Sequence, residues 1–323
     1  MSIIEQATKR LEALNRAGVS VPWAAAGLAE SEVQARVESR QRDAGAVSGP
    51  AEVPSASALR RHELTLLAPV GARAAAESTD LHVDAPMVVL DLEQLERSGH
   101  LVPTQTRSAL AEEFRQIKRP LLKNARSKDP IGSRCSLIMV TSALPGDGKT
   151  FCAINLAMSM AVEIDTSILL VDADVVRPNV LQRLGVPPAK GLLDLLTDGQ
   201  LSLGDLILKT NVPKLSILPA GTRTHASTEL LASDAMEALL GSLTETHPDR
   251  VVIFDAPPLL VTTEARVLAS RLGQVVMVVA ASSTPRSVVA QAFSAVEQCP
   301  IVMSILNKAH APEGPLGYGY YYG

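Results

Sequence analysis

The sequence predicts an α/β fold: a doubly wound, mostly parallel sheet covered by helices on both faces. Apolar runs of strand length recur from residue 137 to residue 306, and segments of helical periodicity separate them. The runs are continuous rather than alternating, which is typical of strands buried on both faces of a parallel sheet. With 323 residues, the chain is long enough for one such domain and a further region before it.

Five segments are expected along the chain. Residues 1–43 hold an amphipathic helical segment and residues 44–84 form a linker rich in Ala, Pro and Ser, so this N-terminal region is predicted to be partly disordered. Residues 85–103 are expected to form a short strand–helix element. The α/β domain occupies residues 104–311, and residues 312–323 form a tail that its glycines and terminal position should make flexible.

The elements of the domain follow from the same periodicities. A helix is expected over residues 108–117, and Pro120 should end or kink it. Strands are predicted at Leu137–Val140, Ile168–Val171, Leu215–Leu218, Val251–Phe254, Val275–Val279 and Ile301–Leu306. Helices are predicted at Thr150–Val162, Thr228–Leu243 and Pro285–Glu297.

Composition excludes several functions. Lys and Arg number 30 against 34 Asp and Glu, a net charge of −4, so we expect no nucleic-acid partner and no coating of anionic lipid. Cys135, Cys152 and Cys299 lie far apart without metal-ligand spacing, which indicates neither a disulfide framework nor a zinc site. No apolar run approaches the roughly 20 residues of a membrane span, and no signal peptide is evident, so a cytoplasmic location is expected.

A glycine-containing segment, TSALPGDGKT at residues 141–150, joins the first strand of the domain to a helix. Gly146 and Gly148 allow backbone N–H groups to turn toward phosphate oxygens, and the helix N-terminus adds its dipole. Lys149 can reach β- and γ-phosphates, and the Thr150 hydroxyl can hold Mg²⁺. This pattern predicts a nucleotide site rather than a plain glycine-rich turn. The residues predicted to contact the nucleotide are Pro145, Gly146, Asp147, Gly148, Lys149, Thr150 and Phe151.

Carboxylates follow two further strands. Asp172 and Asp174 come directly after one apolar run, and Asp255 follows another. Standing alone, such residues would more often cap a helix or a turn. Because ligands of open α/β sheets bind outside the carboxyl ends of the strands, we expect all three to meet the phosphates and the metal.

A phosphate loop followed so closely by a D-x-D strand end resembles the deviant P-loop ATPases, the group that includes MinD and ParA, and implies a P-loop NTPase-like fold. Within that group, the segments PGDGKT, LLVDADVVRP and FDAPP resemble the Walker A, Walker A′ and Walker B motifs of bacterial tyrosine kinases (BY-kinases). Those enzymes regulate capsule and exopolysaccharide export and carry a C-terminal tyrosine cluster. The pattern EEFRQIKRPLLKNA further resembles the exosortase-associated subgroup of tyrosine autokinases.

The resemblance assigns further residues. Asn307 corresponds to the asparagine that lies near the adenine in this family. The series Glu112, Arg115 and Lys118 resembles the family's oligomerisation motif ExxRxxR, with lysine in the last position. A homo-oligomer is therefore implied, in which each tail is phosphorylated in trans.

The tyrosines of the chain, four in number, all lie in its last six residues: Tyr318, Tyr320, Tyr321 and Tyr322. Without a nucleotide site, they would indicate a tail whose aromatic rings pack on the domain or mediate aggregation. Beside such a site, they are predicted to be phosphoacceptors.

The hypothesis is a γ-phosphoryl transfer from Mg·ATP to these hydroxyls. Asp172 is the candidate base, and Asp174 assists it or organises the metal's water. Thr150, Asp174 and Asp255 are the predicted metal residues, and Lys149 offsets charge between the β- and γ-oxygens.

Partners follow from the resemblance as well. Family members carry a fused transmembrane activator or use a separate one. A chain without a span implies a separate inner-membrane polysaccharide chain-length regulator, so the kinase would lie in the cytoplasm, peripheral to the inner membrane. A tyrosine phosphatase is the expected opposing enzyme.

Two alternatives stay open. A MinD/ParA-like positioning ATPase would phosphorylate no protein, but its second signature lysine is missing here and Pro145 stands in the middle of the loop. A nucleotide-gated scaffold of a polysaccharide-export complex would bind ATP and show no phosphotyrosine.

Overall fold

A computed structural model describes residues 86–309, except residue 106, residues 128–133 and residue 248. The predicted segments 1–43, 44–84 and 312–323 lie outside the described residues. Within the described part, no helix has the length and apolar character needed to cross a bilayer.

One eight-stranded sheet forms the centre of the domain, in the order β1-β4-β5-β3-β6-β2-β7-β8. Only the β4–β5 pair is antiparallel, and every other pair of neighbouring strands is parallel. The strands are β1 (Met87–Val88), β2 (Leu137–Ser142), β3 (Ser167–Asp172), β4 (Leu208–Thr210), β5 (Leu215–Leu218), β6 (Arg250–Asp255), β7 (Gln274–Ala280) and β8 (Ile301–Asn307).

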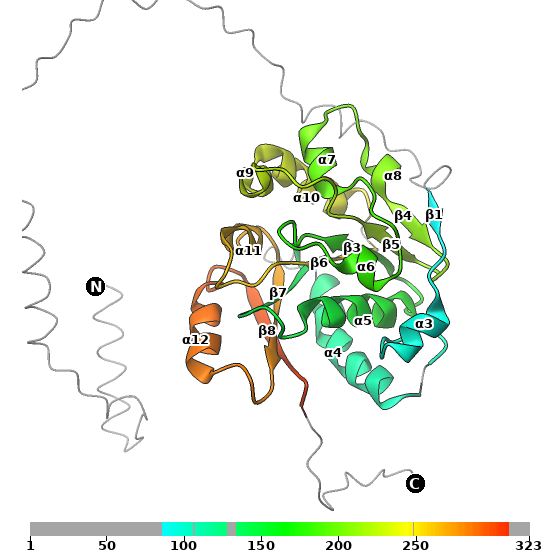
Figure 1. Cartoon of the computed structure of the whole chain (residues 1–323), viewed down its shortest axis with the longest axis vertical. Coiled ribbons are helices and arrows are strands. Elements are labelled where there is room, and N and C mark those ends of the chain that lie inside the picture. Colours follow the sequence, from blue (N-terminus) through cyan, green and yellow to red (C-terminus); the bar gives the residue numbers. More distant parts are fainter. Residues whose placement is uncertain (1–85, 106, 128–133, 248, 310–323) are drawn as a thin grey trace, which may run out of the picture. The chain divides into compact units, whose positions relative to one another are not determined.

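Helices cover both faces of this sheet (Figure 1). They are α3 (Leu92–Arg97), α4 (Ala109–Ala125), α5 (Lys149–Ala161), α6 (Val180–Arg183), α7 (Leu192–Thr197), α8 (Leu203–Leu206), α9 (Ser227–Ala232), α10 (Asp234–Glu245), α11 (Thr263–Ala269) and α12 (Arg286–Ser294). The doubly wound α/β fold is therefore confirmed.

Alternation along each central strand divides the core into two layers. In β2, Ile138 packs in a cluster with residues of α4 and α5, whereas Met139 packs in a second cluster with residues of α10 and α11. Both side chains are fully buried. Successive strand residues point to opposite faces, so a strand that is buried on both sides must be apolar throughout, as the sequence indicated.

Two predicted helices differ from the structure. Pro120 does not end α4, which continues to Ala125. The second half of the helix is fixed by the buried Leu121 and by β7, because the Gln274 amide donates to the Leu121 carbonyl (3.1 Å) and its oxygen accepts from Asn124 (2.9 Å). These contacts offset the hydrogen bond that a proline removes. The predicted helix Thr228–Leu243 is divided at Ser233, whose hydroxyl accepts from the Met236 N–H and caps α10.

The residues before the domain attach to it on two sides. β1 adds an edge strand beside β4, and Asn211 exchanges two hydrogen bonds with the backbone of Leu90. After α3, the Leu101 N–H donates to the Asn155 side chain of α5 at 2.7 Å. The short strand and helix of this region thus reach the helix that follows the phosphate loop.

Candidate active site

The phosphate loop, residues 143–148, joins the end of β2 to the start of α5. Gly146 and Gly148 have φ angles of 91° and 102°, the left-handed region that non-glycine residues rarely adopt. Asp147 holds the turn closed, since one carboxylate oxygen accepts from the Leu144 N–H (3.2 Å) and the other from the Thr284 hydroxyl (2.7 Å). The loop is therefore fixed by its own sequence and by the segment that follows β7.

A second set of contacts comes from the end of β8. The Asn307 side-chain amide donates to the Asp147 carbonyl at 2.8 Å, and Lys308 Nζ donates to the Gly146 carbonyl at 2.7 Å. A Cβ on Gly148 would lie only 2.0 Å from Asn307 Nδ2. The predicted adenine residue Asn307 thus lies directly against the phosphate loop. The contacts of Thr284 and Lys308 with the loop were not predicted from the sequence.

The three predicted carboxylates gather at the same edge of the sheet. Asp172 and Asp255 are register partners at the ends of β3 and β6, and Asp174 follows two residues later. Asp172, Asp174 and Asp255 expose 1%, 3% and 0% of their surface, although carboxylates are seldom buried. The structure therefore brings Asp255 together with two acids that lie more than 80 residues before it in the chain.

Part of this acidic group is already hydrogen-bonded. One oxygen of Asp172 accepts from the N–H groups of Asn179 and Val180, both at 3.0 Å, and Asp174 accepts from the Arg177 N–H at 3.0 Å. The other Asp172 oxygen and both oxygens of Asp255 are buried without a hydrogen-bond partner. Buried acceptors without partners are costly unless a ligand or ion satisfies them.

Lys149, the first residue of α5, extends into this group. Its Nζ lies 2.7 Å from Asp174 Oδ2, 3.8 Å from Asp255 Oδ1 and 3.3 Å from the Thr150 hydroxyl. Burial alone would lower the pKa of Lys149, but the charges of Asp255 and Asp174 outweigh it and the pKa is raised. The lysine is therefore a firmly charged cation at the place where phosphate is expected.

The two register partners have unusual acidities. Burial, and then the charge of Asp255, raises the pKa of Asp172 to about 7, although the Val180 and Asn179 N–H groups oppose the change. Burial also raises the pKa of Asp255 to about 6, against the stabilising charge of Lys149. Carboxylates with such values exchange protons near neutral pH.

The donor set fits a hydrated Mg²⁺. Such an ion is usually bound by one or two carboxylates, a hydroxyl, waters and the phosphates of its nucleotide. The Thr150 hydroxyl and the unpartnered oxygens of Asp255 supply these groups beside Lys149. Residues 86–309, apart from their gaps, contain no cluster of three or more His, Cys, Asp or Glu that would hold a metal by itself.

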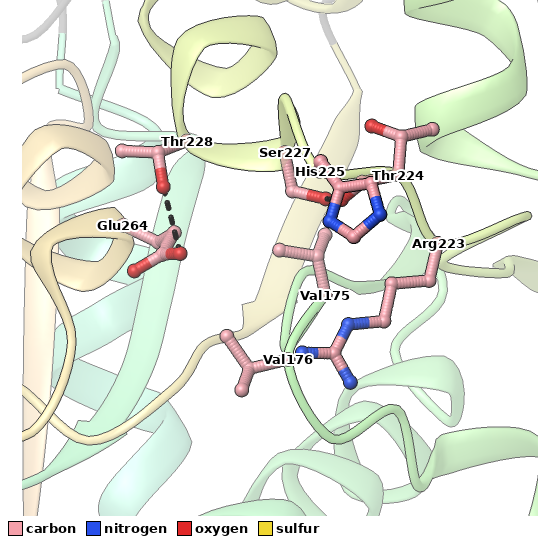
Figure 2. Close-up of a pocket in the computed structure, with 8 residues that line it drawn as sticks. All are labelled: Val175, Val176, Arg223, Thr224, His225, Ser227, Thr228 and Glu264. Atoms are coloured by element: carbon pink, nitrogen blue, oxygen red, sulfur yellow. Dashed lines mark hydrogen bonds between the residues drawn. The ribbon is translucent and has the colours of Figure 1, made fainter.

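A pocket of about 430 Å³ opens beside the D-x-D segment (Figure 2). Val175 and Val176, just after Asp174, form part of its wall, and the Thr228 hydroxyl donates to Glu264 at 2.7 Å on the other side. Arg223 and His225 add basic side chains that the sequence did not single out. The pocket is lined by Val175, Val176, Arg223, Thr224, His225, Ser227, Thr228 and Glu264.

Other predicted residues lie elsewhere. Phe151 packs its ring against His100, with centroids 5.0 Å apart. On α4, Glu112 pairs with Arg115, whereas Lys118 is buried and binds Glu163 at 2.7 Å. The predicted phosphoacceptors Tyr318, Tyr320, Tyr321 and Tyr322 lie outside the described residues.

Comparison with known proteins adds independent findings. Residues 135–297 match the model of a family described as an AAA domain. Tyrosine-protein kinase CpsD of Streptococcus agalactiae is 31% identical over 196 residues, which cover 59% of this chain and 83% of CpsD. The solved structure of the BceF tyrosine kinase domain superposes with a TM-score of 0.54 at 25% identity, covering 68% of this chain and 91% of that one.

Two longer relatives are matched only in part. The putative tyrosine-protein kinase EpsB of Ralstonia nicotianae is 35% identical over 143 residues, 44% of this chain, and the chain spans only 18% of EpsB. The succinoglycan biosynthesis transport protein ExoP of Rhizobium meliloti is 33% identical over 202 residues, 62% of this chain and 25% of ExoP.

Proposed function

The chain belongs to the family of bacterial tyrosine-protein kinases, and we propose that it is an ATP-dependent autokinase that phosphorylates its own C-terminal tyrosines. The observation that carries the proposal is the position of Lys149 among the three buried carboxylates at the carboxyl ends of β3 and β6. A phosphate loop, a carboxylate with a raised pKa and a cation thus support the proposal in a chain whose tyrosines all lie in its last six residues.

In the proposed reaction, Asp172 takes the proton of a tyrosine hydroxyl. That hydroxyl has an ordinary pKa of about 10 and is protonated at neutral pH. As the proton leaves, the tyrosine oxygen forms a bond to the γ-phosphorus of ATP, and the bond from that phosphorus to the β,γ-bridging oxygen breaks to release ADP. The raised pKa of Asp172, about 7, suits a group that accepts a proton near neutral pH.

The other residues of the site stabilise charge. Lys149 is proposed to leave Asp174 when phosphate binds and to contact the β- and γ-oxygens. Thr150 and Asp255 would then hold Mg²⁺, with Asp174 beside them. When bound, Mg²⁺ supplies positive charge to the bridging and γ-phosphate oxygens. The backbone of Gly146 and Gly148 is shaped to donate N–H groups to the same phosphates.

We further propose a role in exopolysaccharide or capsule biosynthesis, supported by the likeness to ExoP, whose name refers to succinoglycan biosynthesis and transport. The kinase would be cytoplasmic and peripheral to the inner membrane through a separate chain-length regulator that activates it. Phosphorylation in trans within a homo-oligomer, and removal of phosphate by a tyrosine phosphatase, complete the proposal. Native mass measurements of phosphorylated and phosphatase-treated protein test the assembly, and identical oligomers in both would contradict it.

The kinase assignment is tested in the native host, where any activator is present. Wild-type and Lys149→Met proteins are isolated during active polysaccharide synthesis, and phosphate on the C-terminal peptide is measured by mass spectrometry. We expect phosphotyrosine among residues 318–322 of the wild type and none in the variant. An unmodified wild-type tail would favour a MinD-like positioning ATPase or a nucleotide-gated scaffold.

A further inference from the structure

A basic groove lies along α4, outside the active site. Arg119, Lys123 and Arg126 follow one another at helical spacings of four and three residues, so their side chains share one face of the helix. They line a groove of about 600 Å³ together with Leu122. The complete lining is Arg115, Lys118, Arg119, Leu122, Lys123, Arg126 and Glu163.

Most of the positive charge of this groove is not neutralised. Lys118 uses its charge on Glu163 at 2.7 Å and also donates to the Ser159 carbonyl at 2.6 Å. Among the described residues, Arg119, Lys123 and Arg126 have no carboxylate partner. Arg126 donates to the Thr166 hydroxyl at 3.0 Å, which leaves its charge in place. Three uncompensated cations thus gather on a chain whose net charge is −4.

We propose that this groove binds the chain's own C-terminal tail after its tyrosines have been phosphorylated. The inference rests on the proposed autokinase function. Each phosphotyrosine carries about −1.5 to −2 charges and three strong acceptor oxygens. Arginine binds such groups through two parallel hydrogen bonds, and lysine binds them as a point charge.

Only phosphorylation gives the tail the charge that matches the groove. Among residues 310–323, Glu313 is the one acidic side chain. Tyr320, Tyr321 and Tyr322 are consecutive, so their phosphorylation concentrates several negative charges in one short segment. The unphosphorylated tail has no comparable cluster of negative charge that could pair with the three cations of the groove.

The tail is also long enough to reach the groove of its own molecule. Lys308, just after β8, is bonded to the Gly146 carbonyl, so the chain leaves the sheet beside the phosphate loop. From there, α5 leads toward Glu163 in the groove, a distance of about 20 Å at the rise of an α-helix. Tyr320 lies about a dozen residues beyond Lys308, and an extended chain of that length spans about 40 Å.

Binding there would connect phosphorylation to assembly. Arg115 lines the groove and also belongs to the series Glu112, Arg115 and Lys118, the predicted subunit contact. A phosphorylated tail in the groove would place negative charge next to this contact. Occupation of the groove would therefore oppose association of the subunits, in addition to repulsion between tails.

The test measures binding of a synthetic peptide and does not depend on kinase activity. The protein is the full chain with Tyr318, Tyr320, Tyr321 and Tyr322 changed to Phe, so that its own tail cannot occupy the groove. The probe is a fluorescein-labelled peptide of residues 310–323 with phosphotyrosine at 320, 321 and 322, followed by fluorescence anisotropy.

We expect the phosphopeptide to bind and the unphosphorylated peptide not to bind. The triple variant Arg119→Gln, Lys123→Gln, Arg126→Gln should lower the affinity at least about tenfold. A matched triple variant, Arg97→Gln, Lys190→Gln, Arg286→Gln, removes the same charge from exposed positions outside the groove and should retain the affinity within about threefold. Raising the salt concentration should weaken wild-type binding.

Three results would overturn the proposal. The phosphopeptide does not bind, the groove variant binds it with the same affinity as the protein with an intact groove, or both triple variants lose the same amount of affinity. Binding of vesicles containing phosphatidylserine, lost in the groove variant while the phosphopeptide does not bind, would assign the groove to a membrane surface instead. Each of these results leaves the autokinase untouched, because that function is read separately from phosphate on the native tail.

Discussion

Asp172 and Asp255 stand opposite each other as register partners at the carboxyl ends of the parallel strands β3 and β6. Both are buried, and the charge of Asp255 is second only to burial among the causes that raise the pKa of Asp172. Neighbouring buried carboxylates resist simultaneous ionisation, so the ionisation of one of these residues depends on the charge of the other. Lys149 is the cation that makes ionisation of Asp255 easier. The site therefore changes its charge near neutral pH.

Phosphorylation of the tail should depend on the ionisation of Asp172. The pKa of this group is about 7, and only its ionised form accepts a proton, so the initial rate of tail labelling should rise with pH through about 7 and then level off. The rate is measured between pH 5.5 and 8.5 with saturating Mg·ATP and the activating partner. Asp172→Asn should slow labelling about 10²-fold or more, remove this rise, and change ATP affinity much less.

The exposed Asp165→Asn variant is the control for this experiment, because it changes a carboxylate at the other end of β3. Its rate and pH profile should match the wild type. An Asp172→Asn enzyme that transfers phosphate at the wild-type rate would show that another group accepts the proton.

The contribution of Asp172 to the stability of the nucleotide-free protein should fall as pH rises from 5 to 8. The pKa of Asp172 is raised from 3.8 to about 7, so the folded chain binds more protons than the unfolded chain between these values. This contribution is fully present below pH 4 and is lost as pH rises through 7. Asp172→Asn removes it while its side-chain oxygen can still accept from the Asn179 and Val180 N–H groups.

The melting temperature of Asp172→Asn should therefore exceed that of the wild type at pH 8, by about 3 °C or more, and approach it at pH 5. Thermal unfolding followed by circular dichroism without nucleotide measures both values. Asp165→Asn should leave the melting temperature unchanged. A lower melting temperature for Asp172→Asn at pH 8 would show that the ionised carboxylate stabilises the fold.

Much of this fold was predictable because its central strands are buried on both faces. The run Leu215–Leu218 was predicted with the bounds of β5, and the run Val251–Phe254 lies one residue inside each end of β6. β4 was not predicted, because a strand of three residues is too short to show a recognisable period. The continuation of α4 beyond Pro120 depends on a hydrogen bond from Gln274, which is distant in sequence. The local helix propensity around Pro120 cannot predict that contact.

The candidate site also has a part that the sequence predicts and a part that it does not. The acids at the strand ends were predictable, because parallel strands bring their carboxyl ends to one edge. The fixation of the loop by Thr284 and Lys308 was not, because neither residue belongs to a pattern that predicts contact with Asp147 or Gly146. Such contacts are set by the packing of β7 and β8 and become visible only in the folded chain.

Replacement of Lys149 by Met should abolish tail labelling. The lysine is the cation nearest to the acidic group, and a preorganised charge of this kind contributes about 10²-fold or more to the rate. Labelling with radioactive ATP in the presence of the activator measures the loss. Lys190→Met removes an exposed lysine outside the loop and should label at the wild-type rate. Persistent labelling of Lys149→Met would place the phosphoryl transfer in a contaminating kinase.

Alanine substitutions at Gly146 and Gly148 can be compared directly to test what determines the shape of the phosphate loop. Both have positive φ, so alanine at either position costs about 1–2 kcal/mol of backbone strain. A Cβ at Gly146 would meet nothing within 4 Å, whereas a Cβ at Gly148 would lie 2.0 Å from Asn307 Nδ2. Gly148→Ala must therefore also displace Asn307 and break its 2.8 Å hydrogen bond to the Asp147 carbonyl.

Calorimetric titration with ATP should show a weaker affinity for both variants. The affinity of Gly148→Ala should be at least about tenfold weaker than that of Gly146→Ala, because displacing Asn307 costs more free energy than the loss of one hydrogen bond. Asn307→Gly in the Gly148→Ala background removes the clash and leaves the backbone strain. If the contact with Asn307 is the cause, the double variant should recover part of the affinity and become similar to Gly146→Ala with the same Asn307→Gly change. Equal affinities for the two single variants would show that backbone strain alone, without the β8 contact, determines the shape of the loop.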